Sequence, residues 1–142
     1  MAKQVTLASA LAVIEAARKQ AEKIGVPMNI AVVDAGANLV AFARMDGAWL
    51  GSIQIAQDKA FTARAFDTTT KELAKISQPG DPLYGIHVSH GGRIVIFPGG
   101  IPLKADGKVV GAIGVSGGMP EQDHEVAEAG ADAFVPGDEA GG

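Results

Sequence analysis

The dipeptide Asp106-Gly107 stands between two runs of strand-forming residues, 101–105 and 109–116. Asp-Gly readily takes the two positive-φ positions of a type I′ turn, so this spacing is typical of a tight β-hairpin. A second pair of strand-like runs, 28–33 and 39–45, is joined by a short segment rich in Asp, Gly and Asn. Two hairpins predict a mainly antiparallel sheet and exclude a Rossmann-type parallel arrangement.

Helical patterns surround these strands. Apolar residues recur at three- and four-residue steps over residues 6–24, where Thr6 is a suitable N-cap, and a second helix is predicted over residues 52–66. Thr69 and Glu72 form a capping-box pattern for a short third helix. Pro120 begins a last helix that extends to about residue 133.

One more strand is predicted over residues 94–97, which gives the element order αββααβββα. This order predicts an α+β fold, with helices flanking a mainly antiparallel sheet. We expect a single domain over residues 1–135 and a disordered tail over residues 136–142.

Composition excludes several classes of protein. The 142 residues carry a net charge of -4 with one Trp and one Tyr, so the basic surface and stacking platforms of a nucleic-acid binder are missing. The apolar runs are too short for a membrane span, and the start of the chain lacks the pattern of a signal peptide. Because there is no Cys, disulfides and thiolate metal sites are excluded, and we expect a cytoplasmic protein.

Two charged residues fall on helix faces that are otherwise apolar. Lys59 lies in the middle of the apolar face of the helix over residues 52–66. Either its ammonium reaches water past a buried stem, or it is desolvated and faces a ligand carboxylate or acts as a base. Asp123 shares a face with apolar residues of the last helix, where it either points inward or interacts with the helix dipole as a first-turn acid.

His87 and His90 are three residues apart in a Gly-flanked loop near Tyr84, and each is chemically able to bind iron or zinc. A preformed zinc site is not expected, because the loop offers no third His and no Cys. A single axial ligand to haem needs only one residue. The chain also lacks Walker, dinucleotide and Gly-x-Ser-x-Gly motifs, which excludes the usual nucleotide enzymes and hydrolases.

Apolar side chains beyond the expected core predict a homo-oligomer. Phe61 falls on the polar side of the second helix, and Trp49 and Leu50 precede that helix. This is more apolar surface than one small sheet is expected to cover, so we predict that the helix lies at an interface between subunits.

Six motifs in a fixed order resemble the GlcG/HbpS family, which includes the C-terminal domain of the PduO proteins. The resemblance covers residues 6–134. The motifs are Val33-Asp34 with Gly36 and Leu39, Arg44-Met45-Asp46-Gly47, Lys59-Ala60 with Thr62-Ala63, Phe97-Pro98-Gly99-Gly100-Ile101-Pro102-Leu103, Gly111-Ala112-Ile113-Gly114-Val115-Ser116-Gly117-Gly118, and Glu121-Gln122-Asp123.

This resemblance implies a five-stranded antiparallel sheet flanked by helices, in a profilin-like architecture. It also implies assembly into dimers that often build octamers, and the binding of haem or a related tetrapyrrole. For some members it implies haem degradation or iron sequestration.

Two hypotheses from different classes follow, besides a third in which the chain is a binding or scaffold subunit without catalysis. The first is a cytoplasmic, haem-binding homo-oligomer in which Lys59 pairs with a propionate and His87 or His90 reaches the iron. The remaining residues expected around that haem are Thr62, Gly99, Gly100, Ile101 and Pro102. The alternative is a cofactor-independent enzyme that uses Lys59 and Asp123 for proton abstraction from a small carbonyl or hydroxy-acid metabolite.

Overall fold

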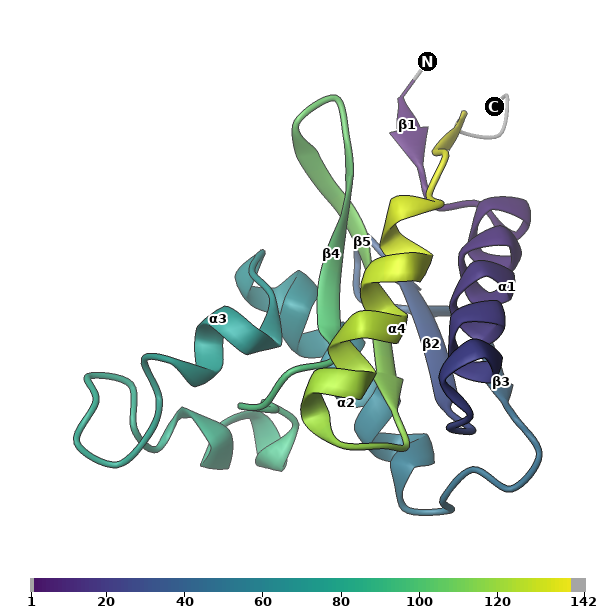
Figure 1. Cartoon of the computed structure of the whole chain (residues 1–142). Coiled ribbons are helices and arrows are strands. Elements are labelled where there is room, and N and C mark those ends of the chain that lie inside the picture. Colours follow the sequence, from purple (N-terminus) through teal and green to yellow (C-terminus); the bar gives the residue numbers. More distant parts are fainter. Residues whose placement is uncertain (1, 139–142) are drawn as a thin grey trace.

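A four-stranded antiparallel sheet with the strand order β3-β2-β5-β4 forms the centre of the computed structural model, which describes residues 2–138 (Figure 1). Its strands are β2 (Asn29–Asp34), β3 (Leu39–Arg44), β4 (Gly100–Ala105) and β5 (Lys108–Ser116). Both predicted hairpins are confirmed, since β2 pairs with β3 and β4 pairs with β5. At the second turn Asp106 and Gly107 have φ values of 52° and 78°, the positive values that a type I′ turn requires.

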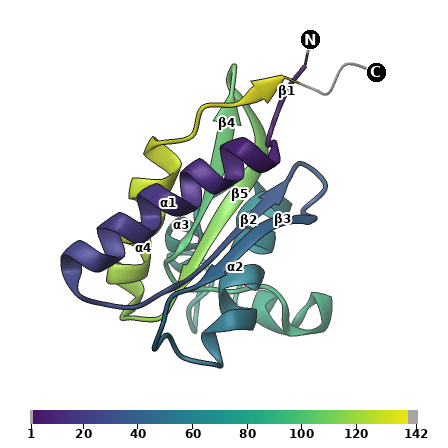
Figure 2. The same ribbon diagram turned by 90° about the vertical axis from the view of Figure 1, so that its right-hand side faces the viewer.

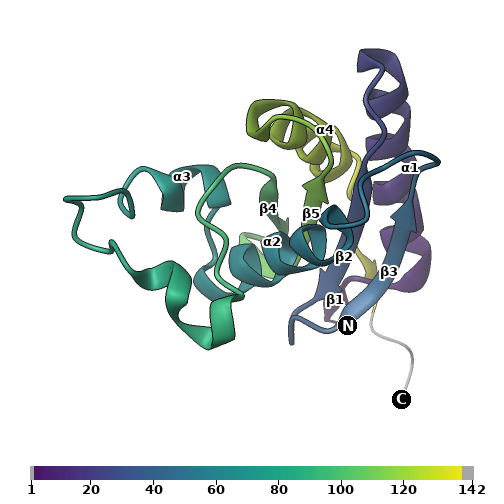
Figure 3. The same cartoon turned by 90° about the horizontal axis from the view of Figure 1, so that it is seen from below.

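Helices cover both faces of this sheet, so the domain has three layers (Figures 2 and 3). The helices α1 (Leu7–Ile24) and α4 (Pro120–Asp132) lie on one face, and α2 (Ser52–Phe66) lies on the other. The N-terminal end of α1 is closed by a reciprocal pair of hydrogen bonds between Thr6 and Ser9, as the predicted N-cap requires. The predicted bounds of α2 are confirmed at both ends.

The alternation of side chains along the strands divides the core between the two faces. Ile30 and Val32 of β2 pack toward α1 and α4, whereas Ala31 and Val33 pack toward α2. Small residues line the α2 side, and there the helix sits directly on the backbone of β5. A Cβ atom added to Gly114 would lie 2.0 Å from the carbonyl oxygen of Ala56, so only glycine permits this approach.

The chain between α2 and β4 projects away from the sheet as a long excursion, seen at the left of Figure 1. It contains α3 (Thr70–Ala74) and two short 3₁₀ turns, Ile86–Val88 and His90–Gly92. The strand predicted over residues 94–97 is wrong, because this segment is irregular. Its backbone is instead tied to α2, where Thr62 Oγ1 accepts a hydrogen bond from the amide of Val95 at 3.0 Å.

The predicted five-stranded sheet is therefore corrected to four strands, while the α+β class with helices flanking an antiparallel sheet is confirmed. A profilin-like architecture stays a prediction. A separate two-stranded sheet joins the ends of the chain, where β1 (Lys3–Gln4) pairs with β6 (Gly137–Asp138). Part of the segment predicted to be a disordered tail is thus paired in a strand, and residues 139–142 of that prediction lie outside the described residues.

No helix in residues 2–138 combines the length and the apolar character that crossing a membrane requires.

Candidate functional site

Lys59 of α2 is fully buried, with 0% of its surface exposed. Its Nζ atom lies 2.8 Å from Oδ2 of Asp123 in α4 and donates a second hydrogen bond to the carbonyl oxygen of Val115 at 2.9 Å. The other carboxylate oxygen of Asp123 accepts a hydrogen bond from the amide of Gly118 at 2.9 Å. The ammonium therefore does not reach water past a buried stem, and Asp123 points inward rather than only facing the helix dipole.

Burial and the ion pair have opposite effects on the pKa values of Lys59 and Asp123. Desolvation lowers the pKa of Lys59 below its ordinary value, and the Asp123 carboxylate works against that shift. Desolvation raises the pKa of Asp123, which the Lys59 ammonium and the amides of Gly118 and Gly117 oppose. Two charges held in this way stabilise each other, because either one alone would remain uncompensated in the interior.

Gly99, just before β4, and Gly100, the first residue of β4, close over Lys59. A Cβ atom on Gly99 would lie 2.5 Å from the carbonyl oxygen of Val115 and 2.7 Å from Lys59 Nζ, and one on Gly100 would lie 2.4 Å from the Lys59 carbonyl oxygen. Gly100 also donates its amide to Oγ1 of Thr70 at 2.9 Å. The structure thus brings Lys59, Gly99 and Gly100 together as expected, but it does so in the interior.

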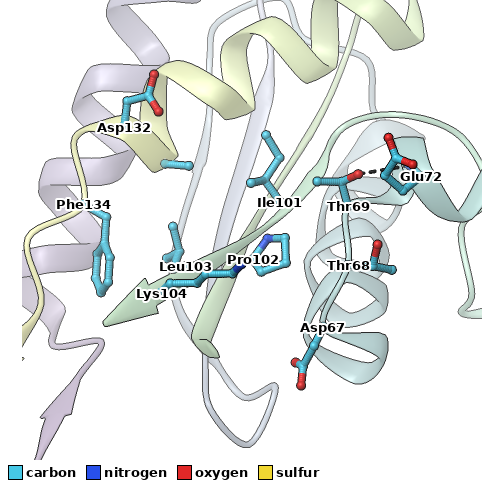
Figure 4. A pocket seen from close by; sticks show the side chains of 11 residues that line it. Asp67, Thr68, Thr69, Glu72, Ile101, Pro102, Leu103, Lys104, Asp132 and Phe134 are labelled. Atoms are coloured by element: carbon cyan, nitrogen blue, oxygen red, sulfur yellow. Dashed lines mark hydrogen bonds between the residues drawn. The ribbon is translucent and has the colours of Figure 1, made fainter. Parts of the chain in front are cut away.

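Ile101 and Pro102, two other residues expected at a ligand site, line an open cleft of about 500 Å³ beside the edge strand β4 (Figure 4). Phe134 and Asp132 flank it on one side in Figure 4, and the segment from Asp67 to Glu72 flanks it on the other. The described residues that line the cleft include no His, Cys, Met or Tyr. The cleft therefore offers apolar surface and carboxylates, but none of the common protein ligands of haem iron.

His90 lies elsewhere, at the point where the excursion folds back onto α2. Its ring centroid is 6.2 Å from that of Phe61 and 6.3 Å from that of Phe66, the latter in an edge-on arrangement. The guanidinium of Arg93 lies over the Phe61 ring at 3.8 Å. We call the surface formed by Phe61, Phe66, His90 and Arg93 the His90 patch.

Sequence analysis identified His90 and Phe61 but missed Phe66 and Arg93. Neither of these residues belongs to a motif, and their contacts depend on how the excursion folds back. Phe61 was expected to be free for a subunit contact, yet it is half-buried beneath Arg93 of its own chain.

His87 has a different environment although it is close in sequence. Its ring packs against Tyr84, with 5.7 Å between the ring centroids, and its buried Nδ1 atom has no hydrogen-bond partner in the described part of the chain. Across residues 2–138, no three His, Cys, Asp or Glu side chains are grouped closely enough to hold a metal ion. The two histidines are thus separate candidates rather than a preformed metal centre.

Comparison with known proteins gives a consistent result over nearly the whole chain. The family model described as haem degrading protein HbpS-like matches residues 5–132. An uncharacterised 15.0 kDa protein from the dhaT-dhaS intergenic region of Citrobacter freundii is 44% identical over 130 residues, which cover 92% of each chain.

Solved structures agree with this match. The Klebsiella pneumoniae protein ORFY has a TM-score of 0.91 and 39% identity, over 94% of this chain and 92% of its own. The PduOC:haem complex has a TM-score of 0.88 and 36% identity, over 94% of this chain and 96% of its own. The resemblance carried by the six motifs is confirmed, and the chain belongs to the HbpS-like family.

Proposed function

We propose that this chain binds haem. The observation that carries the proposal is the similarity to the solved PduOC:haem complex, which has a TM-score of 0.88 and extends over 94% of this chain. Because the match includes the excursion as well as the sheet, it concerns the whole domain rather than a shared core. Because similarity of fold does not transfer a binding site, the residues of this chain must supply the haem site themselves.

The His90 patch fits such a ligand. Haem needs a donor for its iron, apolar surface for its ring, and cations near its propionates. The patch offers an imidazole at His90, the rings of Phe61 and Phe66, and the guanidinium of Arg93, which also forms an ion pair with Asp58 at 3.4 Å. When bound, haem would supply an iron centre able to exchange electrons, and the chain would supply its position and surroundings.

The buried ion pair of Lys59 and Asp123 has a structural role in this proposal. Because Lys59 is 0% exposed, its ammonium cannot meet a propionate or a small metabolite unless the helix packing opens. The same burial argues against the alternative in which Lys59 and Asp123 abstract a proton from a carbonyl or hydroxy-acid substrate. We infer that the pair supports the fold on which the His90 patch is built.

Assembly into a homo-oligomer, from a dimer to an octamer, is part of the proposal. Trp49 and Leu50 are 63% and 75% exposed at the start of α2, and they form a contiguous apolar corner. Such a corner is a candidate contact between subunits. A cytoplasmic location is also proposed, because the sequence carries no Cys.

Haem degradation and iron sequestration are two possible consequences of binding. They are separated by incubating the haem-loaded protein with ascorbate as the reductant and oxygen as the oxidant. Loss of the Soret band together with iron captured by a chelator indicates degradation. A stable Soret band that stays with the protein indicates that the iron is sequestered as intact haem.

The experiment that tests binding is a titration of the apo-protein with haemin, followed at the Soret band. A saturable shift at micromolar haemin is expected. Iron-free protoporphyrin serves as the matched ligand and reports how much of the affinity depends on iron coordination. If haemin produces no saturable shift, the proposed function is wrong.

A further inference from the structure

The hydroxyl group of Ser89 joins two neighbouring groups in the excursion. Its Oγ atom donates a hydrogen bond to the carbonyl oxygen of Ile86 at 2.6 Å. The same Oγ atom lies 3.0 Å from Nδ1 of His90. Since a carbonyl oxygen cannot donate, the single hydroxyl hydrogen of Ser89 is committed to Ile86.

This arrangement selects one tautomer of the His90 ring. With its hydrogen committed, Ser89 Oγ can only accept from His90, so Nδ1 must carry a hydrogen. In the neutral ring the hydrogen then resides on Nδ1, and Nε2 keeps its lone pair. A histidine that binds a metal commonly has this arrangement, in which one ring nitrogen donates to a neighbour and the other is the ligand.

His90 is also held in place by its backbone and its neighbours. Its φ value of 55° lies in the left-handed region, and Gly91 and Gly92 continue the turn with φ values of 65° and 86°. The imidazole is exposed to solvent while it packs near Phe61 and Phe66. The ring therefore has a defined orientation and an accessible nitrogen.

His87 lacks these features. Among residues 2–138 its buried Nδ1 atom has no hydrogen-bond partner, so no hydrogen bond to Nδ1 selects its tautomer. Its aromatic contact is with Tyr84, not with the α2 rings that form the His90 patch. Of the two histidines, His90 is the one whose Nδ1 atom is held by a hydrogen bond and whose ring lies beside Phe61 and Phe66.

We propose that His90 binds haem iron through Nε2 and that Ser89 is a positioning residue that fixes the required tautomer. This inference rests on the proposed haem function and adds the identity of the ligand. It also gives His87 no role in coordination.

The test uses haemin titrations of the full chain, with absorption spectra of the ferric and ferrous states as the readout. His90→Asn is the main variant, because Asn tolerates a positive φ and does not replace imidazole as an iron ligand. His87→Asn is the matched control. Circular dichroism and the urea midpoint show that each variant remains folded.

His90→Asn is expected to weaken haemin binding by about tenfold or more and to lose the spectrum of imidazole ligation, while His87→Asn behaves as wild type. In His90→Gly, added imidazole is expected to restore that spectrum. Ser89→Ala is expected to weaken binding by about tenfold, and Ser89→Thr, which keeps the hydroxyl group, to recover most of it.

The outcomes separate this inference from the proposed function. If wild type binds haemin and His90→Asn binds it with unchanged affinity and spectrum, His90 is not the ligand, although haem binding stands. Loss of binding in His87→Asn alone would transfer the role to His87. Ser89→Ala with wild-type affinity and spectrum would remove the positioning role.

Discussion

Lys59 and Asp123 belong to helices that cover opposite faces of the sheet, yet they form an ion pair of 2.8 Å in the interior. Lys59 Nζ also binds the carbonyl oxygen of Val115 in β5, and Phe97 lies over it with its ring centroid at 5.0 Å. The pair therefore connects all three layers at one end of the sheet. Removing this ion pair should therefore lower the free energy of unfolding of the whole domain.

Asp123→Asn is expected to lower the free energy of unfolding by about 3–5 kcal/mol at neutral pH, because it leaves the Lys59 ammonium buried without a counter-charge. Urea unfolding followed by circular dichroism measures this. Glu121→Gln is the matched control on the same helix, since Glu121 is 71% exposed and pairs with Lys71 at the surface. That control should stay within about 0.5 kcal/mol of wild type. Equal losses of unfolding free energy in Asp123→Asn and Glu121→Gln would show that the buried ion pair does not stabilise the fold.

The pH dependence of Asp123→Asn follows from the lowered pKa of Lys59. In wild type the carboxylate opposes the effect of burial on this pKa, so its loss moves the pKa further below the ordinary value of about 10.4. Between the folded-state and unfolded-state pKa values the unfolded chain binds more protons, and stability rises with pH. The free energy of unfolding is therefore highest above the unfolded-state pKa, where Lys59 is neutral in both states. This gain in stability is lost as the pH falls through the folded-state pKa.

The stability deficit of Asp123→Asn should therefore shrink as the pH is raised from neutral into the alkaline range. Urea unfolding of both proteins at a series of pH values measures that deficit. A difference that stays constant over this range would show that the Lys59 proton is not linked to folding.

Gly114→Ala tests the direct contact between β5 and α2. The new methyl group would lie 2.0 Å from the Ala56 carbonyl oxygen and 2.5 Å from the Ala60 amide nitrogen, so the helix must move away from the sheet. A loss of about 1–3 kcal/mol or more is expected from this overpacking. Gly51→Ala is the control, because a Cβ atom there meets nothing within 4 Å. The urea midpoints of the two variants should differ clearly, and similar midpoints would contradict the packing described for α2.

Local sequence signals were sufficient for most of the fold. Asp106-Gly107 defines its own turn through two positive φ values, and Thr6 caps α1 through a residue three positions away. These features depend on neighbours in the sequence. The spacing of apolar residues likewise placed α2, because that helix buries one regular face.

Long-range contacts explain what the sequence did not show. Residues 94–97 have a strand-like composition, but the amide of Val95 is taken by Thr62, 33 positions earlier. Lys59 was placed on an apolar face, whereas its partner Asp123 is 64 positions away on a different helix. The spacing within one helix cannot reveal such a partner, so the sequence left open whether the Lys59 ammonium reaches water or faces a ligand.

The proposed assembly predicts a role for the apolar corner at the start of α2. Replacing both Trp49 and Leu50 with Ser should lower the mass observed by light scattering, since these side chains are 63% and 75% exposed and should gain burial only in an oligomer. Gln54→Ser, at an exposed polar position of the same helix, should leave the mass unchanged. A monomeric wild type would refute the assembly, and an unchanged mass in the double variant would place the interface elsewhere.

Sedimentation velocity of the wild-type protein loaded with haemin tests the central claim most directly, because it records the protein and the haem in the same boundary. After removal of excess haemin, the account predicts that Soret absorbance moves with the protein absorbance as one species. The His90→Asn variant should lose much of that co-sedimenting absorbance under the same conditions. Soret absorbance that separates from the wild-type protein boundary would contradict haem binding by this chain.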